Sequence, residues 1–215
     1  AFYHDITPFM QIIKSNELVN YPSALQFMQH RVEGIINGSE QEALWFLQHP
    51  ALYTSGTSAK ESDLLSKDFP VYNAGRGGQF TYHGPGQLVC YVMLKLEPKD
   101  VRLFVQRLEQ WVINSLAHFG IKGEVREGRV GIWVNTPNGE EKIAAIGIRL
   151  KKWVSFHGIS ININPDLSHF KGIVPCGLPQ FGVTSFEHLL VDANFDEVAE
   201  VMAKKFNSIF RHPAA

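Results

Sequence analysis

Residues 75–87 read GRGGQFTYHGPGQ, a stretch with five glycines and one proline in thirteen positions. Glycine lets the backbone approach a ligand closely, because it has no Cβ and adopts positive φ at little cost. Arg76 adds a rigid fork of hydrogen-bond donors, and His83 adds a ring that exchanges a proton near neutral pH. A shorter glycine motif would favour a plain two-turn hairpin. The length of this motif favours a binding loop instead.

The segments around this loop predict extended structure. Val71–Ala74 and Gln79–His83 are candidate short strands on either side of the first glycine turn. Gln87–Leu96 is apolar at alternate positions on both faces, which is typical of a central strand. Cys90, in the middle of that strand, is therefore expected to be an inert, packed thiol.

Three segments predict helices, because their apolar residues recur at helical spacing between capping residues. They are Tyr21–Asn37, the residues from Val101 to Phe119, and Phe195–Phe210. Residues 52–59 are polar with a central glycine and predict a loop, followed by a short helix near Lys60–Leu65.

The remaining apolar runs predict strands. The earliest are a short extended segment at Met10–Lys14 and an aromatic-rich run at Ala43–Gln48. The later runs are Arg129–Val134, Lys142–Leu150 and Val154–Ile163, with turns at Asn138-Gly139 and Lys151-Lys152. Asn-Gly between such runs is a strong hairpin signal. The block from residue 123 to 163 thus predicts an antiparallel meander, and no domain boundary interrupts the chain.

The charge and cysteine content exclude several classes of protein. Lys plus Arg number 20 and Asp plus Glu 21, so the chain has no global attraction for nucleic acid or an anionic membrane. No apolar run is long enough to cross a bilayer, and the opening AFYHDITPFM lacks a secretory signal pattern. Cys90 and Cys176 have no CxxC spacing, although one bridge between them stays open. We expect a soluble, cytoplasmic protein.

Cys176, in the turn Val-Pro-Cys-Gly-Leu, is the candidate nucleophile. A thiol attacks as the thiolate, and a nearby cation lowers its pKa. Lys142, at the head of the strand KIAAIGIRL, is one such cation, or else simply the solvated end of a strand. His157 and His169 compete with it as partners of the thiol. The histidines and carboxylates show no metal-ligand spacing, and no phosphate-binding GxxxxGK[ST] loop occurs.

Five motifs together resemble the lipoyl(octanoyl) transferases, relatives of the lipoate and biotin protein ligases. They are RGGQFTYHGPGQ at 76–87, KIAAIGIR at 142–149, HGISININ at 157–164, FKGIVPCG at 170–177 and GVTSF at 182–186. The resemblance runs in order from about His49 to Phe186. Several motifs in order are far harder to match by chance than one.

The resemblance implies a single catalytic domain over residues 1–215, with an α/β (α+β) fold like that of the biotin and lipoate ligases. A mixed, largely antiparallel sheet would pack against helices. The implied reaction, in lipoate biosynthesis and protein lipoylation, moves an octanoyl or lipoyl group from acyl carrier protein to a lysine. The acceptors would be the lipoyl domains of 2-oxoacid dehydrogenase E2 subunits and the glycine cleavage H protein. We expect a monomer that needs neither ATP nor another cofactor.

The resemblance also implies roles for individual residues. Cys176 falls on the family's acyl-enzyme nucleophile, and Lys142 falls on the lysine that lowers the pKa of that thiol and moves protons. The predicted substrate contacts are Arg76, Gly77, Gly78, Gln79, Phe80, Thr81, Tyr82, His83, Ala145, Ile146, Gly147, Gly158, Ile159 and Ser160. Phe80 and Ser160 differ from the residues common in the family, which bears on the details of the acyl pocket.

Because acyl carriers are acidic, we also expect a local basic patch. The candidates are Lys122, Arg126, Arg149, Lys151 and Lys152.

Three rival functions remain on sequence grounds. They are an ATP-dependent lipoate or biotin ligase, a non-catalytic module that binds lipoyl domains or acyl carriers, and a thioesterase. A ligase would tolerate loss of Cys176, a binding module would leave Cys176 and Lys142 unexplained, and a thioesterase would admit water to the acyl-cysteine.

Overall fold

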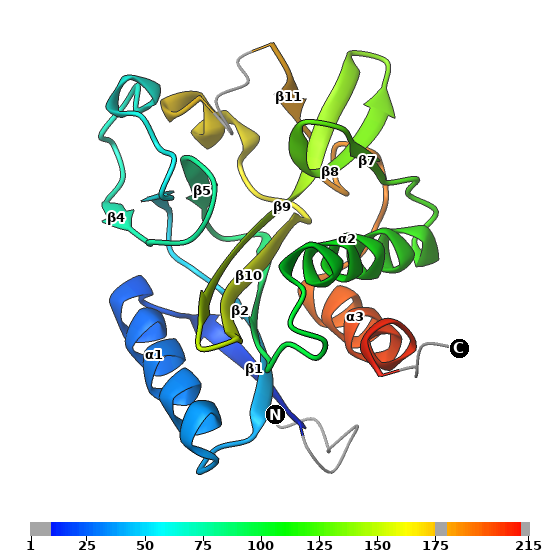
Figure 1. Cartoon of the computed structure of the whole chain (residues 1–215). Helices are drawn as coiled ribbons and strands as arrows, with labels where there is room; N and C mark the ends of the chain where they lie inside the picture. Colours follow the sequence, from blue (N-terminus) through cyan, green and yellow to red (C-terminus); the bar gives the residue numbers. More distant parts are fainter. Residues whose placement is uncertain (1–9, 175–179, 212–215) are drawn as a thin grey trace.

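The computed structural model describes residues 10–174 and 180–211 of the chain (Figure 1). Its helices are α1 (Tyr21–Asn37), α2 (Val101–His118) and α3 (Phe195–Phe210), with short 3-10 turns η1 (Glu61–Asp63) and η2 (Leu167–Gly172). Each α-helix begins at a side chain that accepts a hydrogen bond from the first turn: Asn20, Asp100 and Asn194.

The main sheet has the strand order β1-β2-β6-β10-β9-β8-β7, and β11 pairs with β9 off this path. Its strands are β1 (Met10–Leu18), β2 (Glu42–Gln48), β6 (Gln87–Met93), β7 (Glu124–Arg126), β8 (Arg129–Thr136), β9 (Gly139–Lys151), β10 (Val154–Asn162) and β11 (Gly182–Val183). The pairs β1–β2 and β9–β11 are parallel, and the others are antiparallel. The expected mixed, largely antiparallel sheet is confirmed.

A second, three-stranded sheet carries the glycine loop. Its order is β4 (Val71–Asn73), β3 (Leu52–Ser55) and β5 (Thr81–His83). The loop of residues 74–80 joins β4 to β5, so this small sheet holds it from both ends.

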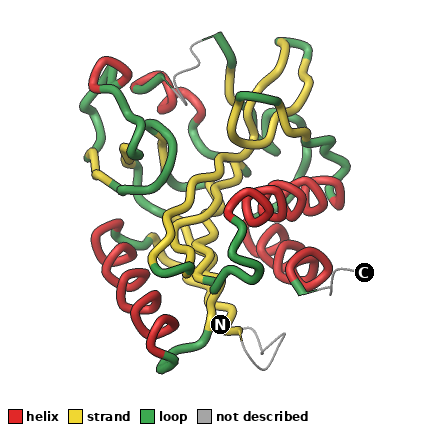
Figure 2. The backbone as a smooth tube through the Cα atoms, viewed as in Figure 1, coloured by secondary structure: helices red, strands yellow, loops and turns green. Residues whose placement is uncertain are grey.

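Helices cover the main sheet on both faces, with α2 and α3 on one side and α1 on the other (Figures 1 and 2). Strand β6 contributes apolar side chains to both faces. Cys90 and Val92 pack with α2 and α3, whereas Val89 and Tyr91 pack with α1. Cys90 is fully buried, and burial raises the pKa of its thiol well above the usual value. The expectation of a packed Cys90 is confirmed.

Several local predictions need correction. Residues 52–55 form strand β3 where a loop was expected, because their backbone pairs with β4 on one side and β5 on the other, and Leu52, Tyr53 and Thr54 are buried. The helix expected at Lys60–Leu65 is only the 3-10 turn η1. Strand β1 extends to Leu18, beyond the predicted Lys14.

The second hairpin turn also lies one residue later than expected. Lys152 and Trp153 have positive φ and form the turn between β9 and β10, whereas Lys151 still pairs with Val154.

Candidate active site

A cavity of about 310 Å³ lies between the glycine loop and the main sheet. Lys142 and every predicted substrate-contact residue except Tyr82 line it. These residues come from three separate stretches of the chain: the glycine loop with β5, the middle of β9 and the middle of β10. The fold therefore brings the predicted site residues together, and their contact with substrate stays a prediction.

Tyr82 points away from this cavity. It is buried among Tyr53, Phe80 and Phe170, and its hydroxyl bonds to Nδ1 of His169 at 2.8 Å. The other ring nitrogen of His169 lies 3.3 Å from a carboxylate oxygen of Asp166. Both nitrogens of His169 thus have partners outside the cavity.

Arg76 stabilises the cavity wall that is formed by the glycine loop. Its Nη1 donates to the carbonyls of Gly77 (2.9 Å) and Gln79 (3.1 Å), and its Nη2 donates to Oγ1 (2.7 Å) and the carbonyl (3.2 Å) of Thr54. The guanidinium therefore ties the glycine loop to β3. A substrate can contact the aliphatic part of Arg76, while the guanidinium N–H groups donate hydrogen bonds to the loop and to Thr54.

The sheet wall is built from small residues in register. Ser160 of β10 pairs with Ala145 of β9, and Gly158 pairs with Gly147. A Cβ on Gly158 would overlap the backbone carbonyl oxygen of Cys90, and a Cβ on Gly147 would lie 3.0 Å from Cδ of Arg76. Gly158 thus lets β6 approach β10 closely, and Gly147 leaves room for the stem of Arg76 beside the cavity.

Lys142 is buried at one end of the cavity. Its Nζ lies 5.0 Å from the ring centroid of Trp133, within the range of a cation–π contact. Gly131 leaves space for it, because a Cβ there would lie 3.0 Å from Cε of Lys142. A strand-end lysine in solvent was the alternative from sequence, and this burial argues against it.

Cys176 lies outside the described residues. Before it, the backbone N–H of Val174 donates to the Asp63 carbonyl at 2.8 Å. After it, Val183 of β11 pairs with Lys142 itself. The described chain therefore returns to Lys142 directly after the segment that contains the predicted nucleophile.

The opposite end of the cavity is formed by Tyr21, Tyr91 and His157. His157 has a φ of 59°, which is rare for a residue other than glycine. Side chains of β10 otherwise alternate between the two faces. The reversed φ places the ring of His157 against Phe156, with ring centroids 5.1 Å apart, and on the cavity side of the sheet.

Burial keeps the histidines at this end neutral. It lowers the pKa of His157 to about 3, with further lowering from the charges of Arg76 and Arg149. Burial likewise lowers the pKa of His83 to about 3 and that of His49 to about 4. Proton exchange near neutral pH, which the sequence suggested for His83, is therefore a poor fit to its surroundings.

Hydrogen bonds fix the orientation of these rings. His49 Nδ1 donates to the Val19 carbonyl at 2.6 Å, so its Nε2 accepts from the Tyr91 hydroxyl at 2.7 Å. His83 Nδ1 donates to Oε1 of Gln87 at 3.0 Å. Neutral rings in fixed tautomers act as hydrogen-bond acceptors.

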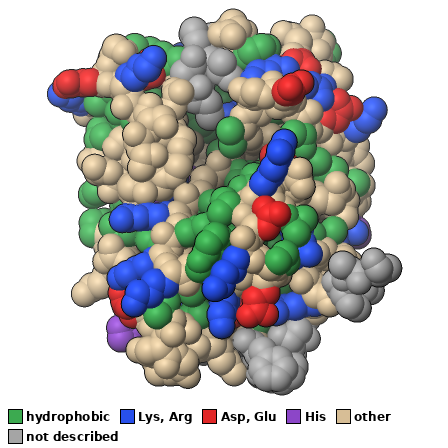
Figure 3. All heavy atoms as spheres, viewed as in Figure 1, with side chains coloured by type: hydrophobic (Ala, Val, Ile, Leu, Met, Phe, Trp, Pro, Cys, Tyr) green, Lys and Arg blue, Asp and Glu red, His purple; other side chains and the backbone are tan. Residues whose placement is uncertain are grey.

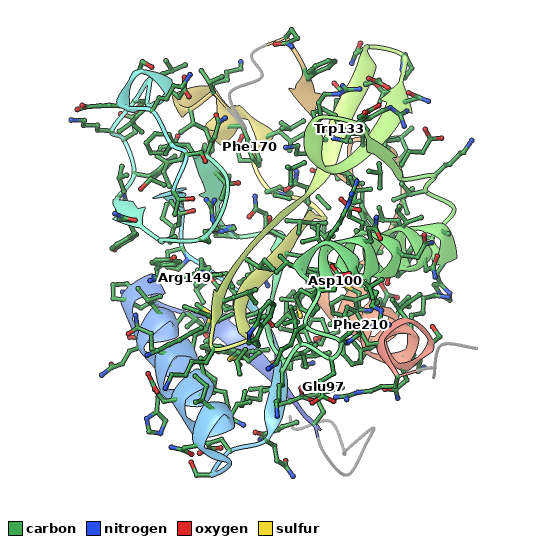
Figure 4. The ribbon with its side chains drawn as sticks, in the orientation of Figure 1. Glu97, Asp100, Trp133, Arg149, Phe170 and Phe210 are labelled. Carbon is green, nitrogen blue, oxygen red and sulfur yellow. The ribbon has the colours of Figure 1, made fainter. Side chains whose placement is uncertain are left out.

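The two ends differ in their access to solvent. Near Lys142 the lining includes Gly128, in the β7–β8 turn, and Val130, at the start of β8, and Val130 is 55% exposed. At the other end, Tyr21 and His157 are almost fully buried. Figure 4 shows Trp133 of β8, which pairs with Lys142, high in the view, and Arg149 of β9 lower in the view. The cavity therefore opens near Lys142 and closes near His157.

The expected basic patch is not one patch. Arg126 bonds to Glu140, near the start of β9, whereas Lys151 ends the same strand and bonds to Glu33 of α1. The eleven residue steps from Glu140 to Lys151 span about 36 Å of extended strand. In Figure 3, basic side chains gather low on this face, while basic and acidic side chains mix at the β7–β8 hairpin.

Sequence reasoning missed part of the cavity lining. Tyr21, Thr54, Val89, Tyr91 and the β7–β8 turn also line it. Tyr21 was assigned only to the start of a helix, and Thr54 to a loop. The sequence pattern around these residues predicts whether they are buried, but it does not indicate which distant strand they contact.

Among residues 10–174 and 180–211, no group of three or more His, Cys, Asp or Glu side chains is placed to hold a metal ion. Within the same ranges, no helix combines the length and apolar character needed to cross a membrane.

Comparisons with known proteins identify the family. The lipoyl protein ligase A/B catalytic domain model matches residues 20–207. An octanoyltransferase of Bartonella quintana is 53% identical, covering 91% of this chain and 85% of the relative. One from a Wolbachia of Brugia malayi is 49% identical, covering 91% and 97%.

A solved structure shares the fold. A bipartite lipoate protein ligase from Thermoplasma acidophilum superposes with a TM-score of 0.70 at 17% identity, covering 94% of this chain and 83% of that one. The chain therefore belongs to the lipoyl protein ligase A/B catalytic domain family and, within it, to the octanoyltransferases, which are acyltransferases.

Proposed function

We propose that this chain transfers an octanoyl group from acyl carrier protein to a lysine of lipoyl domains, through a thioester on Cys176. One observation carries the proposal: Lys142, the glycine loop, β9 and β10 line a single cavity. The pairing of Val183 with Lys142 supports a meeting of Cys176 with that lysine. The acceptor class is supported by the solved ligase from Thermoplasma acidophilum, which was studied with its E2 lipoyl domain.

The reaction would proceed in two steps. In the first, the Cys176 thiolate attacks the carrier thioester, a new carbon–sulfur bond forms, and the carrier thiol leaves. Lys142 would stabilise the thiolate and give a proton to the departing sulfur. In the second, the acceptor lysine amine attacks the acyl-cysteine, an amide forms, and Cys176 leaves as thiolate. Lys142 would then take the proton of the amine.

Intact mass spectrometry tests this proposal directly. The chain is mixed with octanoyl-acyl carrier protein in the absence of ATP, and a lipoyl domain is then added. We expect a covalent octanoyl adduct that passes to the lipoyl domain and is absent in Cys176→Ala. Cys90→Ala is the matched control, because Cys90 is buried on the other side of the sheet, and it should form the adduct normally.

An ATP-dependent ligase is the second candidate, because the fold is shared with a lipoate protein ligase. Transfer that required ATP and survived Cys176→Ala would favour the ligase. Release of free octanoate without an acceptor would indicate a thioesterase.

A further inference from the structure

Arg129 lies at the open end of the cavity. It is the first residue of β8, and it lines the cavity together with its neighbours Gly128 and Val130 and with Lys142. Its Nη2 donates to a carboxylate oxygen of Glu140. Its Nη1 is buried and bonds to none of the described residues. A buried donor without a partner is costly, above all on a charged group, so Nη1 needs an acceptor from solvent or from a ligand.

Two aromatic rings fix the guanidinium of Arg129. Its Cζ lies 4.1 Å from the ring centroid of Phe181 and 4.7 Å from that of Trp133. The two rings are in edge contact, with their centroids 5.3 Å apart. Trp133 also donates from Nε1 to the backbone carbonyl of Arg129 at 3.2 Å. Because the guanidinium is already held in one place, it loses little side-chain freedom when it binds a further acceptor.

The indole ring of Trp133 also sets the distance from Arg129 to Lys142. Nζ of Lys142 lies 5.0 Å from the centroid of that ring, and Cζ of Arg129 lies 4.7 Å from the same point. The two cationic groups are therefore at most about 10 Å apart. A group that accepts from Nη1 of Arg129 is consequently close to any reaction that takes place beside Lys142.

The pairing and position of Arg129 limit what it binds. Its charge is already paired with Glu140, so the remaining N–H suits a neutral carbonyl oxygen. In a carrier thioester, the sulfur is joined to a pantetheine arm. The first amide oxygen of that arm lies about 6 Å from the sulfur, and its phosphate lies about 16 Å away when the arm is extended. With the sulfur beside Lys142, the amide oxygen is within reach of Arg129 and the phosphate is beyond it.

We propose that Arg129 binds the pantetheine arm of the acyl donor, by donating a hydrogen bond from Nη1 to the amide carbonyl oxygen next to the thioester. This inference rests on the proposed octanoyl transfer. The bond holds the arm at the open end of the cavity and presents the thioester to Lys142. The substrate contacts predicted from sequence do not include Arg129.

Two small thioesters test this contact. S-octanoyl-N-acetylcysteamine carries the first amide of the arm, whereas S-pentyl octanethioate has a hydrocarbon of equal length in its place. For each thioester, kcat/KM for octanoyl transfer to a lipoyl domain is measured. The ratio of the two values within one variant does not depend on how much of that protein is folded. The intrinsic difference in reactivity between the two thioesters cancels when the ratios of two variants are compared.

In Arg129→Met, we expect the ratio of the amide-bearing thioester to the pentyl thioester to fall about tenfold, because a hydrogen bond from a charged donor is lost. Arg129→Lys keeps the charge that pairs with Glu140 but lacks the planar fork, so the ratio should fall in the same direction. Arg126→Met is the control. Arg126 bonds to the same Glu140 but does not line the cavity, so the ratio should not change.

An unchanged ratio in both Arg129→Met and Arg129→Lys would overturn the proposed contact. If the ratio stayed constant while kcat/KM for the lipoyl domain fell, with octanoyl-acyl carrier protein as donor, Arg129 would act on the acceptor and the proposal would again be wrong. Failure of the unaltered chain to transfer octanoyl from acyl carrier protein would instead contradict the proposed function itself.

Discussion

The two faces of the main sheet are formed by the same strands, but one face is fully packed and the other borders an open cavity. Toward α2 and α3, residues such as Cys90, Val92 and Ile161 fill the space completely. Toward the glycine loop, the strands present the small residues Ala145, Gly147 and Ser160, and the space stays open. One face of the sheet therefore presents small residues to the cavity, while the packed apolar side chains of the other face stabilise the fold.

The largest expected effect concerns the buried histidines of the cavity side. Folding holds the pKa of His49 at about 4 and those of His83 and His157 at about 3, below the ordinary value near 6.5. Between those values the unfolded chain binds more protons, so the free energy of unfolding falls as pH drops below 6.5. Three such groups give up to about 4 kcal/mol per pH unit.

Urea unfolding at pH 7, 6 and 5 measures this slope. His83→Gln should reduce it by about a third, since one of three groups is removed. His30→Gln, at an exposed position on α1, is the control and should leave it unchanged. A flat stability profile between pH 7 and 5 would contradict the burial of these rings as neutral groups.

Lys142→Met should lower the rate of octanoyl transfer by about 100-fold or more, because it removes the charge and the proton donor but keeps a similar stem. Stability should change little. Lys122→Met, at an exposed lysine, is the comparison. A transfer rate within a few-fold of the unaltered chain would remove Lys142 from the reaction.

Gly158→Ala should cost about 2 kcal/mol of stability, because its Cβ would overlap the Cys90 carbonyl between β6 and β10. Gly77→Ala lines the same cavity, but its Cβ would come no nearer than 3.6 Å to the Ile148 carbonyl oxygen. It should unfold at nearly the same denaturant concentration as the unaltered chain. Equal losses in the two variants would show that close approach of β6 is not what requires glycine at 158.

The smallest effect is expected on the filled face. Cys90→Ala should lower the free energy of unfolding by about 1 kcal/mol through a small cavity, with the rate of transfer unchanged. Measurement of both quantities in one preparation checks the separation of the two faces. A clear loss of transfer with stability preserved would link the filled face to catalysis.

The elements best predicted from sequence are those with strong periodicity. The helices, the central strand and the β8–β9 hairpin at Asn138-Gly139 follow directly from local pattern. Among the short strands, β4 and β5 were predicted, whereas β3, β7 and β11 were not. Strand β11 has only two residues, and its pairing with β9 depends on a partner some forty positions away, at Glu141 and Lys142.

The residues of the candidate site also fall into a group that was predicted from sequence and a group that was missed. Lys142 and the β9 and β10 residues were found because their motifs resemble a family. Tyr21 and Thr54 carry no such motif and join the cavity only when distant elements pack. The residues of the expected basic patch do not lie together: Arg126 of β7 bonds to Glu140 near the start of β9, whereas Lys151 is at the far end of β9.

The hydrogen bonds of Arg76 have one more consequence. Its guanidinium grips main-chain oxygens of Gly77, Gln79 and Thr54, which every amino acid possesses. Apart from the bond to Oγ1 of Thr54, these contacts do not depend on the identity of the neighbouring side chains, such as Phe80. Residues beside the loop can therefore be substituted to accommodate other acyl groups, while the hydrogen bonds of Arg76 maintain the conformation of the cavity wall.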